Sequence, residues 1–241
     1  MNILYKRKNK LFVYRQISNL IIFLLLATLG IYISKSNTEY VFNYSNDEAI
    51  YHGNRNSNKV SLMINVYWGN EYLDEMLNTL KEYNVKTTFF IGGSWAEKYP
   101  ELLTKIYEDG HEIGNHGYFH KDQDKYNYNQ NFEEINMCNK MIKSIIGYDV
   151  NLFAPPSGAF NNSTLKASND LGCLTIMWSK DTIDWRDKDS NLIFNRATKN
   201  ISGGDLILMH PTECTAKALP LILGYYKINN INATTVSNCL S

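Results

Sequence analysis

The chain has 241 residues, of which 44% are hydrophobic and 20% are charged, and its formal net charge is zero. This length is enough for one sizeable core and is short for two domains. The balanced charge and near-neutral isoelectric point argue against a nucleic-acid partner. The four cysteines, Cys138, Cys173, Cys214 and Cys239, form no Cys-x-x-Cys pair, which argues against a zinc ribbon or a thioredoxin-type site. Cys173 lies in an apolar run, so we expect it to be buried.

The N-terminal part of the chain combines a basic flank with an apolar run. Residues 1–16 are basic, and residues 17–34 are almost uncharged. This order is typical of a signal peptide or a membrane anchor, and the run is close to the ~17-residue lower limit for crossing a bilayer. Because a small-x-small cleavage site is hard to find, we favour an uncleaved, single-pass anchor in the cytoplasmic membrane, with the later residues outside. Cleavage would instead give a secreted form.

Residues 35–59 are polar and predict a stalk, whereas residues 60–241 predict one folded domain. Within that domain, short apolar runs alternate with amphipathic segments. The predicted strands are 60–66, 86–91, 112–115, 152–154, 174–178, 205–209 and, weakly, 234–236. The predicted helices are 71–83, 95–109, 132–146, 163–171, 192–200 and 216–228. About seven βα units without a Gly-rich nucleotide loop predict an α/β fold with a parallel sheet, closed as a distorted (β/α) barrel.

Chemically distinctive residues follow the predicted strands, where barrel enzymes place their active sites. His116 and His120 come after the third strand, and a spacing of four can present two imidazoles to one metal ion. Alone, this spacing is a weak signal, because it also arises on solvated turns. Asp181 and Asp184 follow the fifth strand, and His210 follows the sixth. The barrel would bring all of these residues to one end.

Four longer segments contain these residues: GHEIGNHGYFH, LFAPPSGAFN, TIMWSKDTIDW and GDLILMHPT. In this order and spacing they resemble polysaccharide deacetylases of the NodB-homology type, carbohydrate esterase family four. The resemblance covers residues 60–241 and is closest to the membrane-anchored, sporulation-associated branch of spore-forming bacteria. It implies a NodB-like barrel, monomeric by expectation, that removes acetyl groups from N-acetylated cell-wall polysaccharide (peptidoglycan or a chitin-like polymer). It also implies a divalent metal cofactor, with Zn²⁺ expected.

The resemblance gives these residues expected roles. His116 and His120 match the family's two histidine metal ligands, and a bound Zn²⁺ lowers the pKa of its water. His210 matches the general acid that protonates the departing amine, and Asp184 matches the carboxylate that orients His210. The expected sugar-contacting residues are Trp68, Tyr118, Pro156 and Trp185, and the aromatic ones fit core positions equally well.

The family's first motif, T-F-D-D-G, is altered in this chain. The corresponding segment contains no carboxylate: Asn65 stands at the position of the lost catalytic base, and Tyr67 or Val66 at that of the third metal ligand. Because asparagine cannot accept a proton from water, we expect loss of much of the usual ~10²–10⁴-fold acid–base contribution. Ala154 replaces the family's arginine. That loss is coherent, because a buried arginine without its carboxylate partner would be costly.

The third metal ligand and the activity stay open. Asp122, Asp181 and Glu71 are candidates for the ligand, and nothing in the sequence selects among them. Three functions are compatible with the motifs: an N-deacetylase with a rebuilt site, a catalytically inactive glycan-binding pseudoenzyme, and a metal hydrolase of other specificity, such as an O-deacetylase. We expect weak or absent activity on N-acetylglucosamine polymers. The two remaining histidines, His52 and His111, are expected to be structural.

Overall fold

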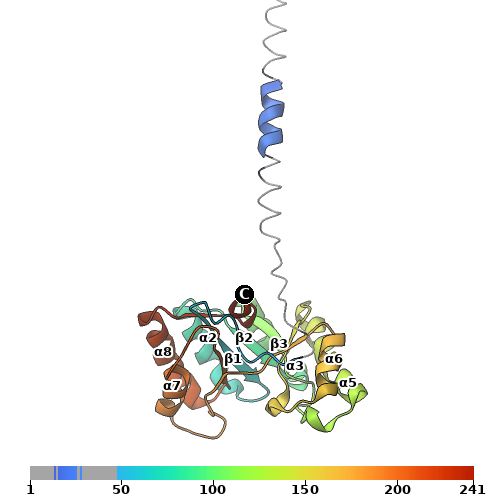
Figure 1. Ribbon diagram of the computed structural model, residues 1–241, viewed down its shortest axis with the longest axis vertical. Coiled ribbons are helices and arrows are strands. Elements are labelled where there is room, and N and C mark those ends of the chain that lie inside the picture. Colours follow the sequence, from blue (N-terminus) through green and yellow to red (C-terminus); the bar gives the residue numbers. More distant parts are fainter. Residues whose placement is uncertain (1–13, 15, 26–27, 29–47) are drawn as a thin grey trace, which may run out of the picture. The chain divides into compact units, whose positions relative to one another are not determined.

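The chain divides into two units, with the boundary after residue 41. The computed structural model describes residues 14, 16–25, 28 and 48–241. The larger unit, Phe42–Ser241, holds the sheet and the helices that are labelled in Figure 1.

The N-terminal unit contains a helix over residues 16–25. Among the described residues, no helix has the length and hydropathy needed to span a bilayer. Of the predicted basic end (residues 1–16), the structure describes only residues 14 and 16. Of the predicted apolar segment (residues 17–34), it describes residues 17–25 and 28. Residues 35–47 of the predicted stalk lie outside the described residues. The membrane anchor therefore stays a prediction.

The larger unit is built on an eight-stranded parallel sheet of order β5-β4-β3-β2-β1-β7-β6, with β8 added to β1. The strands are β1 (Lys59–Val66), β2 (Thr88–Ile91), β3 (Glu112–Asn115), β4 (Leu152–Phe153), β5 (Leu174–Thr175), β6 (Lys180–Asp181), β7 (Leu206–Met209) and β8 (Asn232–Thr234). In the part of the chain that the structure describes, no strand pairing joins β5 to β6, so the barrel is open there. The prediction of a parallel sheet in a distorted (β/α) barrel is confirmed, whereas the expected closure of the sheet is not observed among the described residues.

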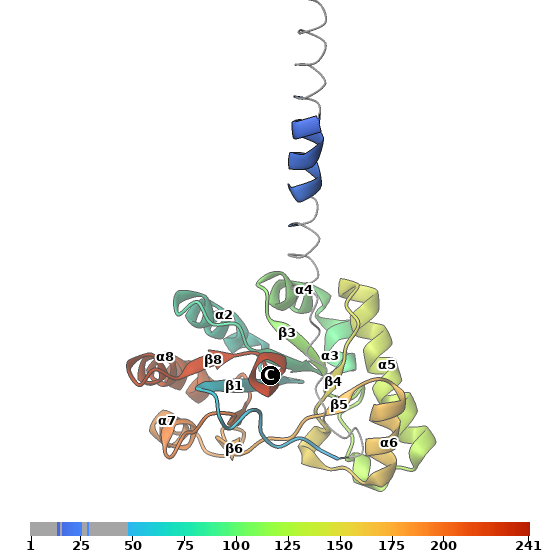
Figure 2. The same cartoon turned by 45° about the horizontal axis from the view of Figure 1, so that its top comes forward.

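Helices surround the strands, as Figure 2 shows. They are α2 (Leu73–Glu82), α3 (Gly93–Lys98), α4 (Pro100–Glu108), α5 (Tyr128–Ile146), α6 (Asn162–Asp170), α7 (Ser190–Thr198), α8 (Glu213–Ile228) and α9 (Val236–Leu240). The prediction of a single helix over 95–109 is wrong, because two helices, α3 and α4, cover this range. Pro100 begins the second helix, at a position where the missing backbone N–H of proline costs no hydrogen bond. The last predicted strand lies two residues earlier, as β8, and α9 follows it.

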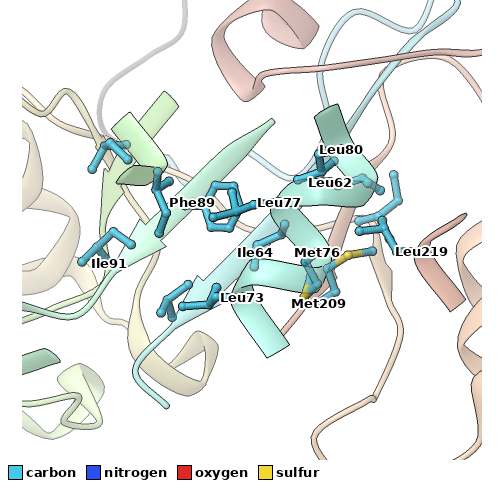
Figure 3. Close-up of a cluster of buried hydrophobic side chains, with 14 of the residues drawn as sticks. Leu62, Ile64, Leu73, Met76, Leu77, Leu80, Phe89, Ile91, Met209 and Leu219 are labelled. Carbon is cyan, nitrogen blue, oxygen red and sulfur yellow. The ribbon is translucent and has the colours of Figure 1, made fainter. Parts of the chain in front are cut away.

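Side-chain alternation along β1 divides the core into two layers. Leu62 and Ile64 belong to the outer layer, which packs under α2 and α8; Figure 3 shows them beside Leu73, Met76, Leu77 and Leu80 of α2. Met63 belongs to the inner layer, with Phe90, Leu152, Ile176 and Leu206. Asn65, two residues after Met63, therefore faces the interior of the barrel near the end of the strand.

Residues 48–58 pack against the barrel, so the folded domain begins earlier than the boundary at residue 60 suggested by the sequence. Ile50 forms an isolated bridge with Ile176, and His52 with Asp205. Arg55 makes a 2.6 Å ion pair with Asp205, whose side chain is buried. The polar composition of this stretch thus reflects hydrogen-bonded contacts with the domain.

The short helix α9 covers the end of the barrel at which the strands begin. The backbone N–H of Val236 donates to the hydroxyl of Thr88, the first residue of β2, at 2.7 Å. Cys239 packs directly against Gly53. All four cysteines are free thiols, and Cys173 is buried as predicted. The opposite end of the barrel, where the strands finish, holds the candidate site.

Candidate functional site

A hollow of about 400 Å³ lies at the carboxyl ends of the strands. It is lined by Asn65, Trp68, His116, His120, Ser157, Trp178, Asp181, Trp185, Leu208 and His210. Its volume lies within the ~300–1,000 Å³ typical of small-molecule sites. The residues singled out at positions 65, 116, 120 and 210 therefore meet in one place, as the barrel topology predicts.

The loop after β3 brings His116 and His120 together, with ring centroids 5.0 Å apart. His116 is buried, and its Nδ1 donates to the carbonyl oxygen of Ala154 at 2.8 Å, which leaves Nε2 as an acceptor for a ligand. Burial, and then the neighbouring His120, lower the pKa of His116 to about 3. Burial also lowers the pKa of His120. Both imidazoles are therefore neutral at physiological pH.

A buried carboxylate on the loop after β6 orients His210. Asp184 Oδ1 accepts from His210 Nδ1 at 2.8 Å, and Oδ2 accepts from the backbone N–H of His210 at 2.6 Å. Thr215, in the first turn of α8, donates its hydroxyl to the same Oδ2 at 2.5 Å. Three hydrogen bonds thus fix one carboxylate, and that carboxylate fixes the imidazole. Nothing in the sequence marks Thr215 as a partner of Asp184, because a threonine near the start of a helix is typical of a helix cap.

Two aromatic rings from the altered first motif cover the two flanking histidines. Tyr67 stacks on His120 with centroids 4.7 Å apart, and the ring of Trp68 lies almost parallel to that of His210 at 5.7 Å. The Tyr67 hydroxyl accepts from the hydroxyl of Ser94 at 3.2 Å and donates to the carbonyl oxygen of Phe119 at 3.4 Å, so neither of these partners is a histidine side chain. The segment that should carry carboxylates therefore presents π faces to the site instead.

The position expected to hold the base is a buried amide. Asn65 is 4% exposed, and its Oδ1 has no hydrogen-bond partner among the described residues. Val66 lies in the outer core and Ala154 in the inner apolar layer, so neither position offers a polar group to the hollow. Of the two alternatives for the lost ligand position, only Tyr67 lies beside a metal-ligand candidate.

The four expected sugar-contacting residues divide into two pairs. Trp68 and Trp185 line the hollow and are 44% and 56% exposed. Tyr118 is buried, and its hydroxyl donates to Glu97 at 2.8 Å, away from the hollow. Pro156 is also buried and packs against Gly117; its neighbour Ser157 reaches the hollow. Side-chain direction at these positions depends on the turns around them, which the motif alone does not specify.

Glu134 on α5 supports the loop that carries His116 and His120. Its carboxylate accepts from the backbone N–H of Phe119 at 2.5 Å and from that of Tyr118, and burial raises its pKa. Asn115 supports the same loop by accepting from the N–H of Gly117 at 2.7 Å. Because Glu134 lies in the middle of a helix, no local sequence signal marks it as part of the site.

The residues present do not complete a metal site of the expected kind. Catalytic zinc takes three protein ligands, such as two histidines and a carboxylate. Among the described residues, no group of three His, Cys, Asp or Glu side chains is arranged to hold a metal ion. Of the candidates for the third ligand, Asp181 lines the hollow, Asp122 pairs with Lys125 at 2.6 Å, and Glu71 lines neighbouring hollows. The hollow therefore offers two neighbouring imidazoles, His116 and His120, as candidate ligands.

The family model of polysaccharide deacetylases matches residues 52–176, which is more than half of the chain. The chain belongs to the polysaccharide deacetylase family. It is 39% identical over 193 residues to the uncharacterized protein YlxY of Bacillus subtilis, covering 80% of this chain and 60% of that protein. It is 34% identical over 142 residues to a peptidoglycan-N-acetylglucosamine deacetylase of Bacillus cereus, covering 59% and 52%.

A solved structure of similar fold extends this comparison. The crystal structure of BA3943 from Bacillus anthracis, described as a CE4 family pseudoenzyme, matches with a TM-score of 0.80 and 34% identity, over 83% of this chain and 70% of that one. A mutant of BA3943 is described as having restored enzymatic activity. The present chain spans only about half to three fifths of the length of the curated relatives named above. The narrower placement in a sporulation-associated branch stays a prediction.

Proposed function

We propose that this member of the polysaccharide deacetylase family binds N-acetylated cell-wall glycan and that its N-deacetylase activity is weak or absent. The observation that carries the proposal is the buried amide of Asn65 at the position of the base. The peptidoglycan deacetylase among the relatives supports the glycan class of ligand, and the pseudoenzyme supports loss of turnover.

The chemistry of the lining explains why turnover is expected to be low. Hydrolysis of an amide needs a group that takes a proton from water, and a positioned base contributes roughly 10²–10⁴-fold to such a rate. Asn65 offers no basic atom, and the first motif supplies no other. The Trp68 and Trp185 faces at the mouth of the hollow remain suited to packing against sugar rings.

A second candidate function is slow hydrolysis in a rebuilt site. It is favoured by the intact His210–Asp184 pair, whose 2.8 Å contact is the arrangement that a general acid requires. Asp181, the one carboxylate in the lining of the hollow, is the group that would replace the base. Its pKa is raised by burial, which makes it a better proton acceptor than an exposed aspartate.

The proposed function is tested by measuring binding and turnover together. The full chain is expected to bind the N-acetylglucosamine tetramer while acetate release from the tetramer and from peptidoglycan stays near background. Trp185→Ala is expected to weaken binding by about tenfold through loss of ring packing. Tyr107→Ala, which removes an exposed aromatic from α4, is the matched control. Turnover at a rate comparable with an active deacetylase would refute the proposal.

We further propose that Zn²⁺ is the ion that His116 and His120 would hold. With only these two imidazoles as proposed ligands, binding is expected to be weak and readily reversed by a chelator. Equilibrium dialysis against Zn²⁺ should show about one ion per wild-type chain and none for the His116→Ala/His120→Ala variant. Equal zinc content in the two proteins would contradict this assignment.

We also propose that residues 17–34 anchor the chain in the cytoplasmic membrane with the folded domain outside. The support is the basic flank followed by an uncharged apolar run. Protease added to intact protoplasts should remove the domain, and the uncleaved chain should stay with membranes through carbonate extraction. Recovery of the chain in the carbonate supernatant would exclude the anchor.

A further inference from the structure

The charges around the hollow favour a cationic ligand. Among the described residues that line it, none is a lysine or an arginine, and Asp181 is the one carboxylate. The segment 181–189 holds four aspartates, one arginine and one lysine, which give it a net charge of −2. Arg196, which pairs with Asp187 at 2.6 Å, brings this sum to −1. A hollow bordered by net negative charge attracts cations.

Asp181 has one carboxylate oxygen available to such a ligand. Its Oδ1 accepts from the backbone N–H of Ile183 at 2.7 Å, which fixes the side chain. Its Oδ2 accepts from no described residue and is not among the atoms sealed from solvent. Asp181 is in register with Leu208 of β7, so the two side chains share the face that lines the hollow. Burial raises the pKa of this carboxyl, because it has lost water without gaining an ion-pair partner.

Two imidazoles add accessible lone pairs to this carboxylate. His116 donates its Nδ1 proton to Ala154, and His210 donates its own to Asp184, so each neutral ring accepts at Nε2. Neither Nε2 atom bonds to a described residue, and neither is sealed from solvent. An ammonium group has three donors and no acceptor, so these acceptors are complementary to it.

The aromatic part of the lining is also suited to a cation. The indole rings of Trp68, Trp178 and Trp185 border the hollow. The electron-rich faces of such rings attract ammonium groups, and several rings around one space form the aromatic cages that recognise them. Trp185 already has a cation beside it, because the guanidinium of Arg186 lies over this ring at 5.9 Å from its centroid.

The remaining polar side chains of the lining give an acetamido group little advantage. Asn65 and Ser157 are neutral, and they suit the hydroxyl groups that acetylated and free amino sugars share. Oδ1 of Asn65 is sealed from solvent, so this amide cannot accept the N–H of an acetamido group. The charged and aromatic groups therefore decide the preference.

We propose that the hollow binds the protonated amine of a de-N-acetylated sugar within the cell-wall glycan, with Asp181 as its counter-ion. The inference rests on the proposed glycan binding and names the sugar that this part of the site prefers. In this arrangement the chain recognises the group that a deacetylase leaves behind.

The test compares three probes by calorimetry on the full chain, in EDTA and at a mildly acidic pH that keeps a sugar amine protonated. They are the N-acetylglucosamine tetramer, the fully de-N-acetylated glucosamine tetramer, and tetralysine, which carries ammonium groups without sugar rings. The wild type is expected to bind the glucosamine tetramer about tenfold more tightly than the acetylated tetramer. Tetralysine should bind at least about tenfold more weakly than the glucosamine tetramer.

A matched pair of variants assigns the preference to Asp181. Asp181→Asn keeps an oxygen that accepts from the N–H of Ile183 and removes only the charge. It should weaken binding of the glucosamine tetramer by about tenfold and change that of the acetylated tetramer by less than about twofold. Asp124→Asn makes the same change in the short helix η2 (Gln123–Lys125), at an exposed position outside the lining, and should alter neither affinity.

The outcomes separate this inference from the proposed function. Binding of the acetylated tetramer that is equal or tighter, or an undiminished preference in folded Asp181→Asn, would overturn the inference and leave glycan binding intact. Tetralysine binding as tight as that of the glucosamine tetramer would also overturn it. Binding of neither tetramer would overturn both proposals. Binding of the glucosamine tetramer alone would support the inference and contradict the acetylated ligand of the proposed function. If circular dichroism shows Asp181→Asn to be unfolded, the three wild-type affinities decide the question.

Discussion

Replacing Asn65 and Tyr67 together by aspartate is expected to raise acetate release from N-acetylated glycan by about 10²-fold or more over the wild type in the presence of Zn²⁺. The first substitution supplies a base at the buried amide. The second places a carboxylate beside His120, on which the Tyr67 ring now stacks at 4.7 Å, and so completes a set of two histidines and one carboxylate. Val66 is the poorer position for that carboxylate, because its side chain lies in the outer core.

The control for this gain is the His210→Ala change in the double variant. If the gained activity uses the oriented His210–Asp184 pair, its removal should return the rate to the wild-type level. A gain that survives the loss of His210 would mean that hydrolysis follows another route. No gain at all in a folded double variant would show that more than the first motif has been lost.

Acid is expected to destabilise the fold through His111, by about 3 kcal/mol between pH 6.5 and pH 4. The imidazole is 4% exposed, and burial, followed by the charge of Lys86, lowers its pKa from 6.5 to about 4. In this window the unfolded chain binds a proton that the folded chain does not, so the free energy of unfolding falls as the pH falls. Protonation would also remove the lone pair with which Nδ1 accepts from the N–H of Thr87 at 3.2 Å.

Denaturant unfolding of the wild type and of His111→Gln at several pH values measures this contribution. Glutamine keeps an acceptor for the Thr87 N–H but does not titrate, so the variant should lose less stability on acidification. Because the other histidines are common to both proteins, the difference between the two curves isolates His111. Parallel curves would mean that this imidazole is not buried in its neutral form.

The arrangement of the site could be predicted from the sequence because parallel strands end at one edge. His116 and His210 follow strands separated by almost a hundred residues, yet both line the hollow, since each comes directly after a buried run. Asn65, which lies within β1, was expected there from the resemblance of the first motif instead. Their chemical roles stay predictions, because position alone does not assign a proton transfer.

Other features could not be predicted, for identifiable physical reasons. The strand β6 has only two residues, Lys180 and Asp181, whose polar side chains give no apolar alternation. Tyr118 was expected at the sugar, but its direction is set by the hydrogen bond to Glu97, a residue of α3. Glu134 stabilises the histidine loop from the middle of α5, and a buried carboxylate in a helix has no signature that separates it from an exposed one. Long-range partners of this kind become visible only in the folded chain.

Three of the four tryptophans of the chain, Trp68, Trp178 and Trp185, line the hollow. The intrinsic tryptophan fluorescence of this protein should therefore report mainly on the site. Trp68 and Trp185 are well exposed, so a sugar that covers them should move the emission to shorter wavelength without any label. The fourth indole, that of Trp95, is buried and should give a constant background. A fluorescence titration can thus follow the binding of sugar in the hollow directly, even where no product is released.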